Sequence, residues 1–340
     1  MTENRRDKIL EYIKKNKRAS AAELIKYVAE SGFAQCSKIT VLRDLDKLIA
    51  EGKIIKTGRA RSTVYEPALD IDEYFAKEQD ERILKSESFN FGIWDEIKNI
   101  FSRQELKELA VLNEQYRKNR DKLTPALLKK EFERLTIELS WKSSKIEGNT
   151  YSLLETERLI KEKEEAAGKK REETVMILNH KKALDFILAE PEYFQTLTFA
   201  KLMELYALLM SDLGVNLGLR NHRVGITGTN YKPLDVPSQI KDAVLKLIET
   251  INAATDPCAK ALIAVLMISY IQPFEDGNKR TGRILGDALL LAQGYCPLSY
   301  RSANETEYKK AVVLFYEQND FSCFKKLFMG QFEEAVKKYF

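Results

Sequence analysis

A polar, glycine-containing loop lies between two strongly apolar segments, and it constrains this chain more than any other feature of the sequence. The upstream segment, residues 257–271, is apolar on nearly every side, and the downstream segment, residues 284–294, has apolar residues at helical spacing. Pro257 after Asp256 is typical of the first position of a helix. The pattern predicts two buried helices joined by a loop that opens directly into the second helix.

This loop, residues 272–283, carries the groups that bind a phosphate anion. The first backbone N–H groups of a helix lack intrahelical partners, and the helix dipole favours negative charge there. Arg280 and Arg283 lie three residues apart, so both guanidinium groups can project from one helix face towards successive phosphates. The Asp276 carboxylate can bind Mg²⁺. The sequence therefore predicts a phosphate site at this helix start.

Residues 271–283, IQPFEDGNKRTGR, resemble the signature motif of the Fic family, which reads histidine, proline, phenylalanine, any residue, acid, glycine, asparagine, glycine, arginine, two residues, arginine. The resemblance implies a mainly α fold, a Fic-type helical bundle with a small β-hairpin flap. It also implies transfer of AMP from ATP to a Ser, Thr or Tyr hydroxyl of a protein, with Asp276 binding Mg²⁺. The residues that it assigns to the phosphates are Gly277, Asn278, Lys279, Arg280 and Arg283.

Two positions depart from the family motif. Gln272 occupies the position of the histidine that, in the family, takes the proton from the target hydroxyl, and glutamine cannot accept that proton. Loss of a general base typically lowers a rate by about 10²- to 10⁴-fold. Lys279 stands where most AMP-transferring members have glycine and resembles the Doc branch, whose members phosphorylate a protein. Gln272 is compatible with natural divergence and with an introduced inactivating change, and the transferred group stays open between AMP and phosphate.

Residues 143–149, SSKIEGN, resemble the inhibitory-helix motif of Fic proteins that are regulated from their own N-terminal side. The resemblance implies that Ser143, Glu147 and Gly148 form this motif and that Glu147 pairs with Arg283. Because one guanidinium group cannot satisfy two anions at once, Glu147 would exclude the γ-phosphate of ATP. The alternative interpretation is an ordinary carboxylate at the end of a helix.

Residues 218–233 interrupt the helical pattern and predict a β-hairpin. In the family, the corresponding flap holds a target segment by strand addition, and the residues implied for docking are Val224, Gly225, Ile226 and Thr227. A plain connecting loop is the alternative. The chain has two histidines, His180 and His222, and we expect neither to replace the missing base.

The N-terminal residues 1–67 predict three short helices followed by a hairpin. Ser20 with Glu23 forms a capping-box pattern, Ser37 can cap the third helix, and β-prone residues 53–57 and 62–66 flank a basic turn. Three helices and a hairpin are typical of a winged helix-turn-helix, and residues 40–54 resemble the recognition helix and wing of bacterial regulators.

A positive charge accompanies this N-terminal module. Residues 1–66 contain 15 Lys/Arg and 9 Asp/Glu, a net charge of +6, whereas the whole chain carries +4. The winged-helix interpretation predicts that double-stranded DNA is bound by the following residues: Ser37, Lys38, Thr40, Arg43, Arg59 and Arg61. A protein-interaction module with solvated charges is the alternative.

Four segments are predicted along the chain: the winged helix-turn-helix (1–67), a connector (68–92), an N-terminal helical region with the inhibitory motif (93–170), and the Fic core with the C-terminal helices (171–340). No apolar run reaches membrane-spanning length and the N-terminus lacks the apolar core of a signal peptide, so we expect a cytoplasmic protein. The resemblance also implies that the chain can form a homodimer.

Two functions are compatible with these features. The first is a Fic-family enzyme that transfers AMP to a protein hydroxyl and is both autoinhibited and weakened by Gln272. The second is a catalytically inactive, Fic-like transcriptional regulator that senses a nucleotide while the winged helix binds DNA.

Overall fold

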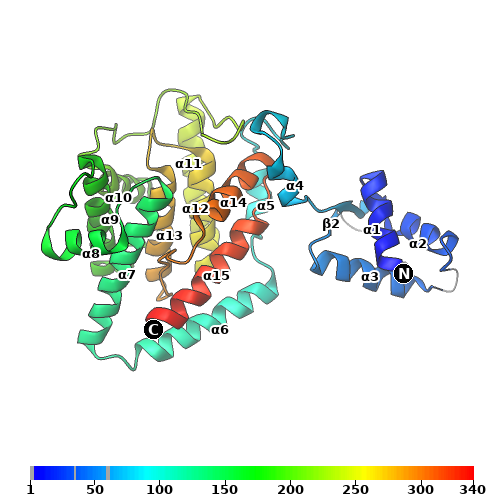
Figure 1. The fold of residues 1–340 in the computed structure, drawn as a ribbon, viewed down its shortest axis with the longest axis horizontal. Helices are drawn as coiled ribbons and strands as arrows, with labels where there is room; N and C mark the ends of the chain where they lie inside the picture. Colours follow the sequence, from blue (N-terminus) through cyan, green and yellow to red (C-terminus); the bar gives the residue numbers. More distant parts are fainter. Residues whose placement is uncertain (1–3, 34–35, 59–61) are drawn as a thin grey trace. The chain divides into compact units, whose positions relative to one another are not determined.

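The computed structural model of the chain describes residues 4–33, 36–58 and 62–340 (Figure 1). The chain divides into two compact units, Met1–Arg82 and Ile83–Phe340. The boundary falls inside the connector predicted for residues 68–92, so the first part of that connector packs with one unit and the rest with the other. Within the described residues, no helix combines the length and the apolar character that crossing a membrane requires.

The described residues of the N-terminal unit form four α-helices, a short 3₁₀ helix and a small antiparallel sheet. Ser20 and Glu23 form the predicted capping box, since the Ser20 side chain accepts from the Glu23 amide and the Glu23 carboxylate accepts from the Ser20 amide. The strand order is β1-β3-β2, with Thr57 paired to Val64. Its elements are α1 (Arg5–Asn16), β1 (Ala19–Ser20), α2 (Ala21–Glu30), α3 (Lys38–Ala50), β2 (Ile54–Thr57), β3 (Val64–Pro67), α4 (Ile71–Ala76) and the 3₁₀ helix η2 (Gln79–Glu81).

The second unit is helical. Capping side chains mark several helix starts, for example Ser102, whose hydroxyl accepts from the Glu105 amide, and Thr124, which precedes a proline at the first helical position. Its elements are α5 (Ile93–Ile97), α6 (Arg103–Arg120), α7 (Pro125–Ile146), α8 (Leu153–Glu162), α9 (Arg171–Ala189), η3 (Pro191–Phe194), α10 (Phe199–Met210), α11 (Pro237–Ala253), α12 (Pro257–Ile271), α13 (Asn278–Leu291), α14 (Glu305–Gln318) and α15 (Ser322–Tyr339).

The two helices predicted around the polar loop are α12 and α13, and they lie at the centre of this unit. Every residue of α12 from Ala261 to Ile271 is buried, because other helices of the unit surround it. Gly282 lets α13 approach α12 closely, since a Cβ there would lie 3.1 Å from the Val265 carbonyl oxygen. This close contact fixes the first turn of α13, which carries the predicted phosphate ligands.

Residues 218–233 do not form the predicted hairpin: their one β-bridge is parallel and joins Lys232 to Ser88. The physical reason is that backbone amides near both ends of the segment bond to carbonyls outside it. The Arg220 amide donates to the Pro273 carbonyl, and the Lys232 amide donates to the Glu87 carbonyl. Inside the turn, the buried Arg220 guanidinium donates to the His222 carbonyl. The flap is therefore an irregular segment that is held at both ends.

Candidate functional site

The loop between α12 and α13 turns through two left-handed residues. Gln272 ends α12 with φ 51° and ψ 59°, and Gly277 precedes α13 with φ 77°. This left-handed conformation favours glycine at position 277, and a Cβ there would also require the Met210 side chain to shift. Phe274 is fully buried and stacks on Tyr206 with ring centroids 3.6 Å apart, which anchors the middle of the loop.

Asn278 and Gln272 stabilise this loop together. The Asn278 amide group donates to Gln272 Oε1 and to the Phe274 carbonyl, both at 2.9 Å, and its Oδ1 accepts from the Phe274 amide. Gln272 Nε2 donates to the Ser269 carbonyl at 2.6 Å. Both ends of the Gln272 carboxamide are therefore bonded within the protein, and Gln272 acts here as a neutral bridge across the loop.

A cavity of about 220 Å³ opens over the start of α13. Its wall brings together Gln272 and most of the predicted phosphate ligands with the centre of the predicted flap. The lining residues are Glu147, Gly225, Ile226, Thr227, Gln272, Glu275, Asp276, Gly277, Asn278, Lys279 and Arg280. The helix start, two cations and three carboxylates therefore share one small, polar cavity.

Arg280 is the cation most closely tied to this cavity. Its side chain is only 2% exposed, and Nη2 pairs with the Asp276 carboxylate at 2.8 Å. Within the parts of the chain that the structure describes, the buried Nη1 has no hydrogen-bond partner. Burial lowers the pKa of Arg280, although the nearby Asp276 and Glu147 carboxylates oppose this shift. Such a buried donor has a hydrogen bond left to make.

Arg283 lies behind Glu147 and is fully buried. Its Nη2 donates to Glu147 Oε1 at 2.8 Å and to the Ser143 carbonyl at 3.0 Å. Nε donates to Ser143 Oγ at 2.9 Å, and Nη1 donates to Tyr308 Oη at 3.1 Å. The contact that the inhibitory-helix motif predicts between Glu147 and Arg283 is therefore present.

Glu147 also contacts Lys279, whose Nζ lies 3.3 Å from Oε2. Burial alone would raise the pKa of Glu147, but the charges of Arg283 and Lys279 outweigh it and lower this pKa to about 2. Gly148 follows with φ 97°, a left-handed conformation that turns the chain away after α7. A charged carboxylate is thus held by two of the predicted phosphate ligands.

A second cavity, of about 430 Å³, lies beside the first, and Glu147, Ile226, Thr227 and Lys279 line both. The walls found only in the second cavity are partly apolar and come mainly from α14. They are Ile146, Gly148, Gly228, Tyr308, Lys309, Val312, Val313 and Tyr316. A polar cavity and a more apolar cavity therefore adjoin. Glu147 lines both cavities and separates them from the buried Arg283.

His180, which we did not predict to take part in the site, lies in this network. It is fully buried in α9, and its Nε2 lies 2.8 Å from Ser143 Oγ. Tyr308 and Tyr316 were also missed, although Tyr308 bonds Arg283 and Tyr316 lies 3.4 Å from Gln272 Nε2. No short motif in the sequence marks these three residues, because their relation to the loop depends on helix packing.

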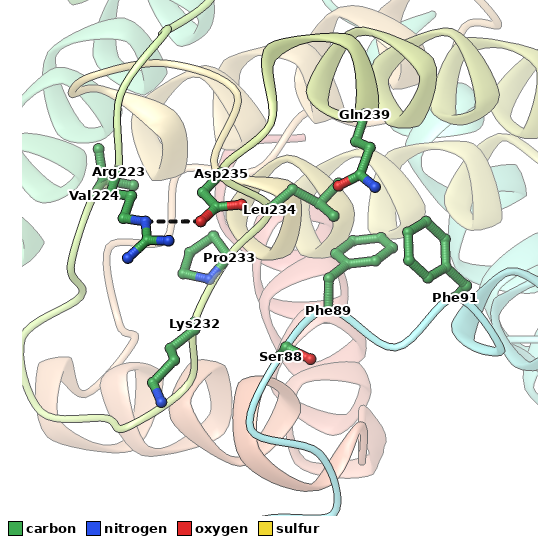
Figure 2. Close-up of a pocket in the computed structure, with 10 residues that line it drawn as sticks. All are labelled: Ser88, Phe89, Phe91, Arg223, Val224, Lys232, Pro233, Leu234, Asp235 and Gln239. Carbon is green, nitrogen blue, oxygen red and sulfur yellow. Dashed lines mark hydrogen bonds and ion pairs between the residues drawn. The ribbon is translucent and has the colours of Figure 1, made fainter.

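The predicted docking residues lie along two cavities. Gly225, Ile226 and Thr227 line the 220 Å³ cavity, whereas Val224 lines a separate pocket of about 370 Å³. Figure 2 shows this pocket with Phe89 and Phe91 from the segment before α5 and with Arg223, which pairs with Asp235 at 2.7 Å. The segment from 223 to 227 therefore runs from this pocket to the candidate phosphate site.

The DNA-binding candidates lie in the N-terminal unit. Ser37 caps α3 by accepting from the Thr40 amide, and its hydroxyl lies 2.9 Å from the Thr40 hydroxyl, so both hydroxyls have local partners. Lys38 and Arg43 are exposed on α3. The other two candidates, Arg59 and Arg61, lie outside the described residues.

Residues 196–290 match the family model described as the Fic/DOC family. The match contains the irregular segment, α12, the loop and nearly all of α13. It leaves out Glu147 and the N-terminal unit.

Two groups of curated proteins are similar to the chain. Protein adenylyltransferase fic-1 of Caenorhabditis elegans is 28% identical over 200 residues, which cover 57% of this chain and 39% of that protein. Protein adenylyltransferase Fic of Drosophila ananassae is 26% identical over 166 residues, which cover 48% of this chain and 33% of that protein. The chain therefore spans less than half the length of these relatives.

Solved structures show the same fold. Fic-1 from C. elegans aligns with a TM-score of 0.58 and 19% identity, covering 70% of each chain. A Fic domain containing signaling protein from Bacteroides thetaiotaomicron aligns with a TM-score of 0.57 and 21% identity, covering 68% of this chain and 94% of the other. The predominantly helical architecture predicted from the sequence is thereby confirmed.

Proposed function

Because this chain contains a domain of the Fic/DOC family, we propose that it binds ATP and transfers AMP to a hydroxyl group of a protein. The relatives named protein adenylyltransferase support the reaction type. The observation that carries the proposal for this chain is Arg280, a buried guanidinium group with an unpaired donor at the wall of a polar cavity.

The two adjoining cavities fit the two halves of ATP. The smaller cavity has the α13 helix start and Arg280, which suit the phosphates, while the larger one has the Tyr308 and Tyr316 side chains and valines, which suit a nucleoside. Lys279 lies between them and can reach a phosphate once Glu147 leaves. In the structure as it stands, Glu147 occupies the Arg283 donor that a terminal phosphate would need.

A magnesium ion fits this arrangement as a partner of the nucleotide. In the parts of the chain that the structure describes, no group of three or more His, Cys, Asp and Glu side chains could hold a metal. Asp276 lines the phosphate cavity and its side chain is 65% exposed, so it can supply the single carboxylate that Mg²⁺ needs when phosphates provide further ligands. When bound, the ion would neutralise charge on the phosphates.

The chemistry is a displacement at the α-phosphorus of ATP. The target hydroxyl oxygen forms a bond to this phosphorus, the bond to the β-phosphate bridging oxygen breaks, and pyrophosphate leaves. Gln272 stands at the position of the family histidine, and its carboxamide cannot take the hydroxyl proton. The proton therefore passes to water, and we expect a rate about 10²- to 10⁴-fold below that of a protein with a base at this position.

We place the target segment along Val224 to Thr227. Val224 lines the 370 Å³ pocket, and Gly225, Ile226 and Thr227 line the phosphate cavity. An extended chain rises about 3.3 Å per residue, so three residues span about 10 Å. A peptide paired with this backbone would bring one hydroxyl to the cavity. Its next residues would pass the pocket beside Phe89 and Phe91.

Labelled ATP tests the reaction directly. The native chain, Glu147→Gly, Gln272→His and the double variant are incubated with ATP labelled at the α- or the γ-phosphate, using the chain itself and total lysate protein as acceptors. We expect the double variant to incorporate most label, only from α-labelled ATP. Label from γ-labelled ATP alone would assign phosphate transfer, and no incorporation by the double variant with either ATP would contradict group transfer.

The regulatory alternative also has support in the structure. The bonded carboxamide of Gln272 and the exposed Lys38 and Arg43 on α3 suit a nucleotide sensor with a DNA-binding, winged-helix unit. Binding to a labelled DNA duplex would then weaken steeply with salt. We expect Lys38→Glu to weaken it much more than Lys26→Glu on α2. Equal effects of both substitutions, or no binding at low salt, would contradict this role.

A further inference from the structure

The hydrogen on the buried His180 ring can be placed from its two contacts. Nδ1 lies 2.8 Å from the Met176 carbonyl oxygen, and Nε2 lies 2.8 Å from Ser143 Oγ. A carbonyl oxygen only accepts, so Nδ1 must carry a hydrogen. Burial, with the charge of Arg280, lowers the pKa of His180 to about 3, which leaves Nε2 without a hydrogen at neutral pH. The Ser143 hydroxyl must therefore donate to Nε2.

This assignment determines what Ser143 offers to Arg283. With its hydrogen given to His180, the hydroxyl oxygen is left with lone pairs, and Arg283 Nε donates to it at 2.9 Å. The Ser143 carbonyl accepts from Nη2 of the same guanidinium group. One serine therefore holds two nitrogens of Arg283 and leaves the remaining Nη2 hydrogen directed at Glu147.

We propose that His180 is a positioning residue for Arg283. Because His180 accepts the Ser143 hydrogen, the hydroxyl oxygen can only accept from Arg283 Nε. This hydrogen bond orients the guanidinium group and so fixes the direction in which Nη2 contacts an anion. A serine inside a helix otherwise donates to a carbonyl of its own preceding turn, which rotates the oxygen away from a neighbouring helix. The anion is Glu147 in this structure and, resting on the proposed function, a phosphate of ATP when Glu147 leaves.

The ring tautomer gives a first test that does not involve ATP. The chain has only two histidines, so a ¹⁵N-histidine-labelled full chain gives two ring systems, and His222→Gln identifies the His180 signals. We expect the His180 hydrogen on Nδ1 at neutral pH, with Nε2 shifted by the hydrogen bond that it accepts. A hydrogen on Nε2 would overturn the proposal, because Ser143 would then be an acceptor from the ring.

Two substitutions of His180 distinguish the role of its hydrogen-bond acceptor, Nε2, from the role of its side-chain volume. Glutamine can place an acceptor near the position of Nε2, whereas asparagine is shorter and reaches only towards the Met176 carbonyl. In the Glu147→Gly background, we expect His180→Asn to weaken Mg-ATP binding about three- to tenfold, the effect of one lost hydrogen bond. His180→Gln should stay within about twofold of the background. Calorimetric titration of the full chain measures both.

Ser143→Ala shows whether the effect of His180 on Mg-ATP affinity depends on Ser143. We expect His180→Asn to add no further loss of Mg-ATP affinity once Ser143 is alanine, because the two residues act on Arg283 in series. Equal losses with and without Ser143 would mean that His180 only packs, and would overturn the proposal. If the Glu147→Gly variant itself bound no Mg-ATP, the proposed function would fail, while the tautomer measurement would still decide the role of His180.

Discussion

The Glu147 carboxylate at the end of α7 lies 2.8 Å from the guanidinium group of Arg283 on α13, and Arg283 is fully buried behind it. This ion pair joins the inhibitory-helix motif to the phosphate loop, two segments more than 120 residues apart in the sequence. Because the contact uses the donor that the proposed phosphate would need, we expect it to oppose nucleotide binding as long as Glu147 stays charged. With a pKa lowered to about 2, Glu147 stays charged at every physiological pH.

Replacing Glu147 by glycine should have opposite effects on the free and the nucleotide-bound chain. Without ATP, the variant should melt at a lower temperature, by about 2–4 °C for each kcal/mol lost, since Arg283 loses a partner. With Mg-ATP, it should gain more thermal stability than the native chain does, because binding stabilises the folded state. Thermal unfolding with and without Mg-ATP measures both effects.

Glu157→Gln is the control for this comparison, because Glu157 is paired with Lys161 on the surface of α8. Its stabilisation by Mg-ATP should equal that of the native chain. An equal gain for Glu147→Gly and the native chain would contradict the inhibitory role of Glu147.

Gly277→Ala should destabilise the phosphate loop. The substitution puts a side chain on a left-handed residue and places its Cβ 2.4 Å from the Met210 sulfur. We expect a loss of about 1–3 kcal/mol in the free energy of unfolding. Urea unfolding followed by tryptophan fluorescence measures the stability of the second unit, Ile83–Phe340, alone, since both tryptophans, Trp94 and Trp141, lie in it.

Gly330→Ala is the matched control for Gly277→Ala. Gly330 lies inside α15 with open space around the position of its Cβ, so alanine there should stabilise by about 0.5–1 kcal/mol. If both substitutions changed the stability by the same amount, the loop would not have the conformation described.

The stability of the second unit, Ile83–Phe340, should fall as the pH drops below 6.5, in part because of His180. Its pKa is lowered from 6.5 to about 3 in the folded chain, so between these values the unfolded chain binds the extra proton. That stability is present above pH 6.5 and is lost progressively towards pH 3. From pH 7 to 5.5, the native chain should lose about 1 kcal/mol more than His180→Gln in urea unfolding. Equal losses would show that His180 is protonated in the folded chain.

Arg220 should contribute far more to the free energy of unfolding than Arg223, which lies three residues further along the chain. The buried Arg220 guanidinium donates to the carbonyls of Gln272, His222 and Leu234, whereas the Arg223 side chain is 85% exposed and pairs with Asp235. We expect Arg220→Met to cost at least about 3 kcal/mol and Arg223→Met less than about 1 kcal/mol. Limited proteolysis of the 218–233 segment should increase only in the first variant. Similar proteolysis of both would contradict the anchoring role of Arg220.

The sequence predicted best those parts of the site that follow from local patterns. The apolar run of α12, the loop and the start of α13 form one continuous pattern, and the pairing of Glu147 with Arg283 follows from the resemblance of two motifs. The hairpin prediction for residues 218–233 was wrong, because Pro273, Glu87 and Ser88, which lie outside that segment, pair with its backbone. Such long-range partners leave no periodic pattern in the segment itself.

The network behind Arg283 could not be predicted for a related reason. His180 appeared to be an ordinary residue of a helix, and only the packing of α9 against α7 brings it to Ser143. Tyr308 likewise reaches Arg283 from α14. A buried polar network of this kind depends on which helix faces meet, and helical periodicity alone does not determine that.

The central claim is that the start of α13, together with Arg280, binds the phosphates of ATP. Calorimetric titration of the Glu147→Gly variant with Mg-ATP, compared with the Glu147→Gly/Arg280→Ala variant, tests it most directly. We predict binding by the first variant and an affinity about 10- to 100-fold lower in the second, the effect of losing charge-assisted hydrogen bonds. No binding by the first variant, or equal affinities in both, would contradict the claim.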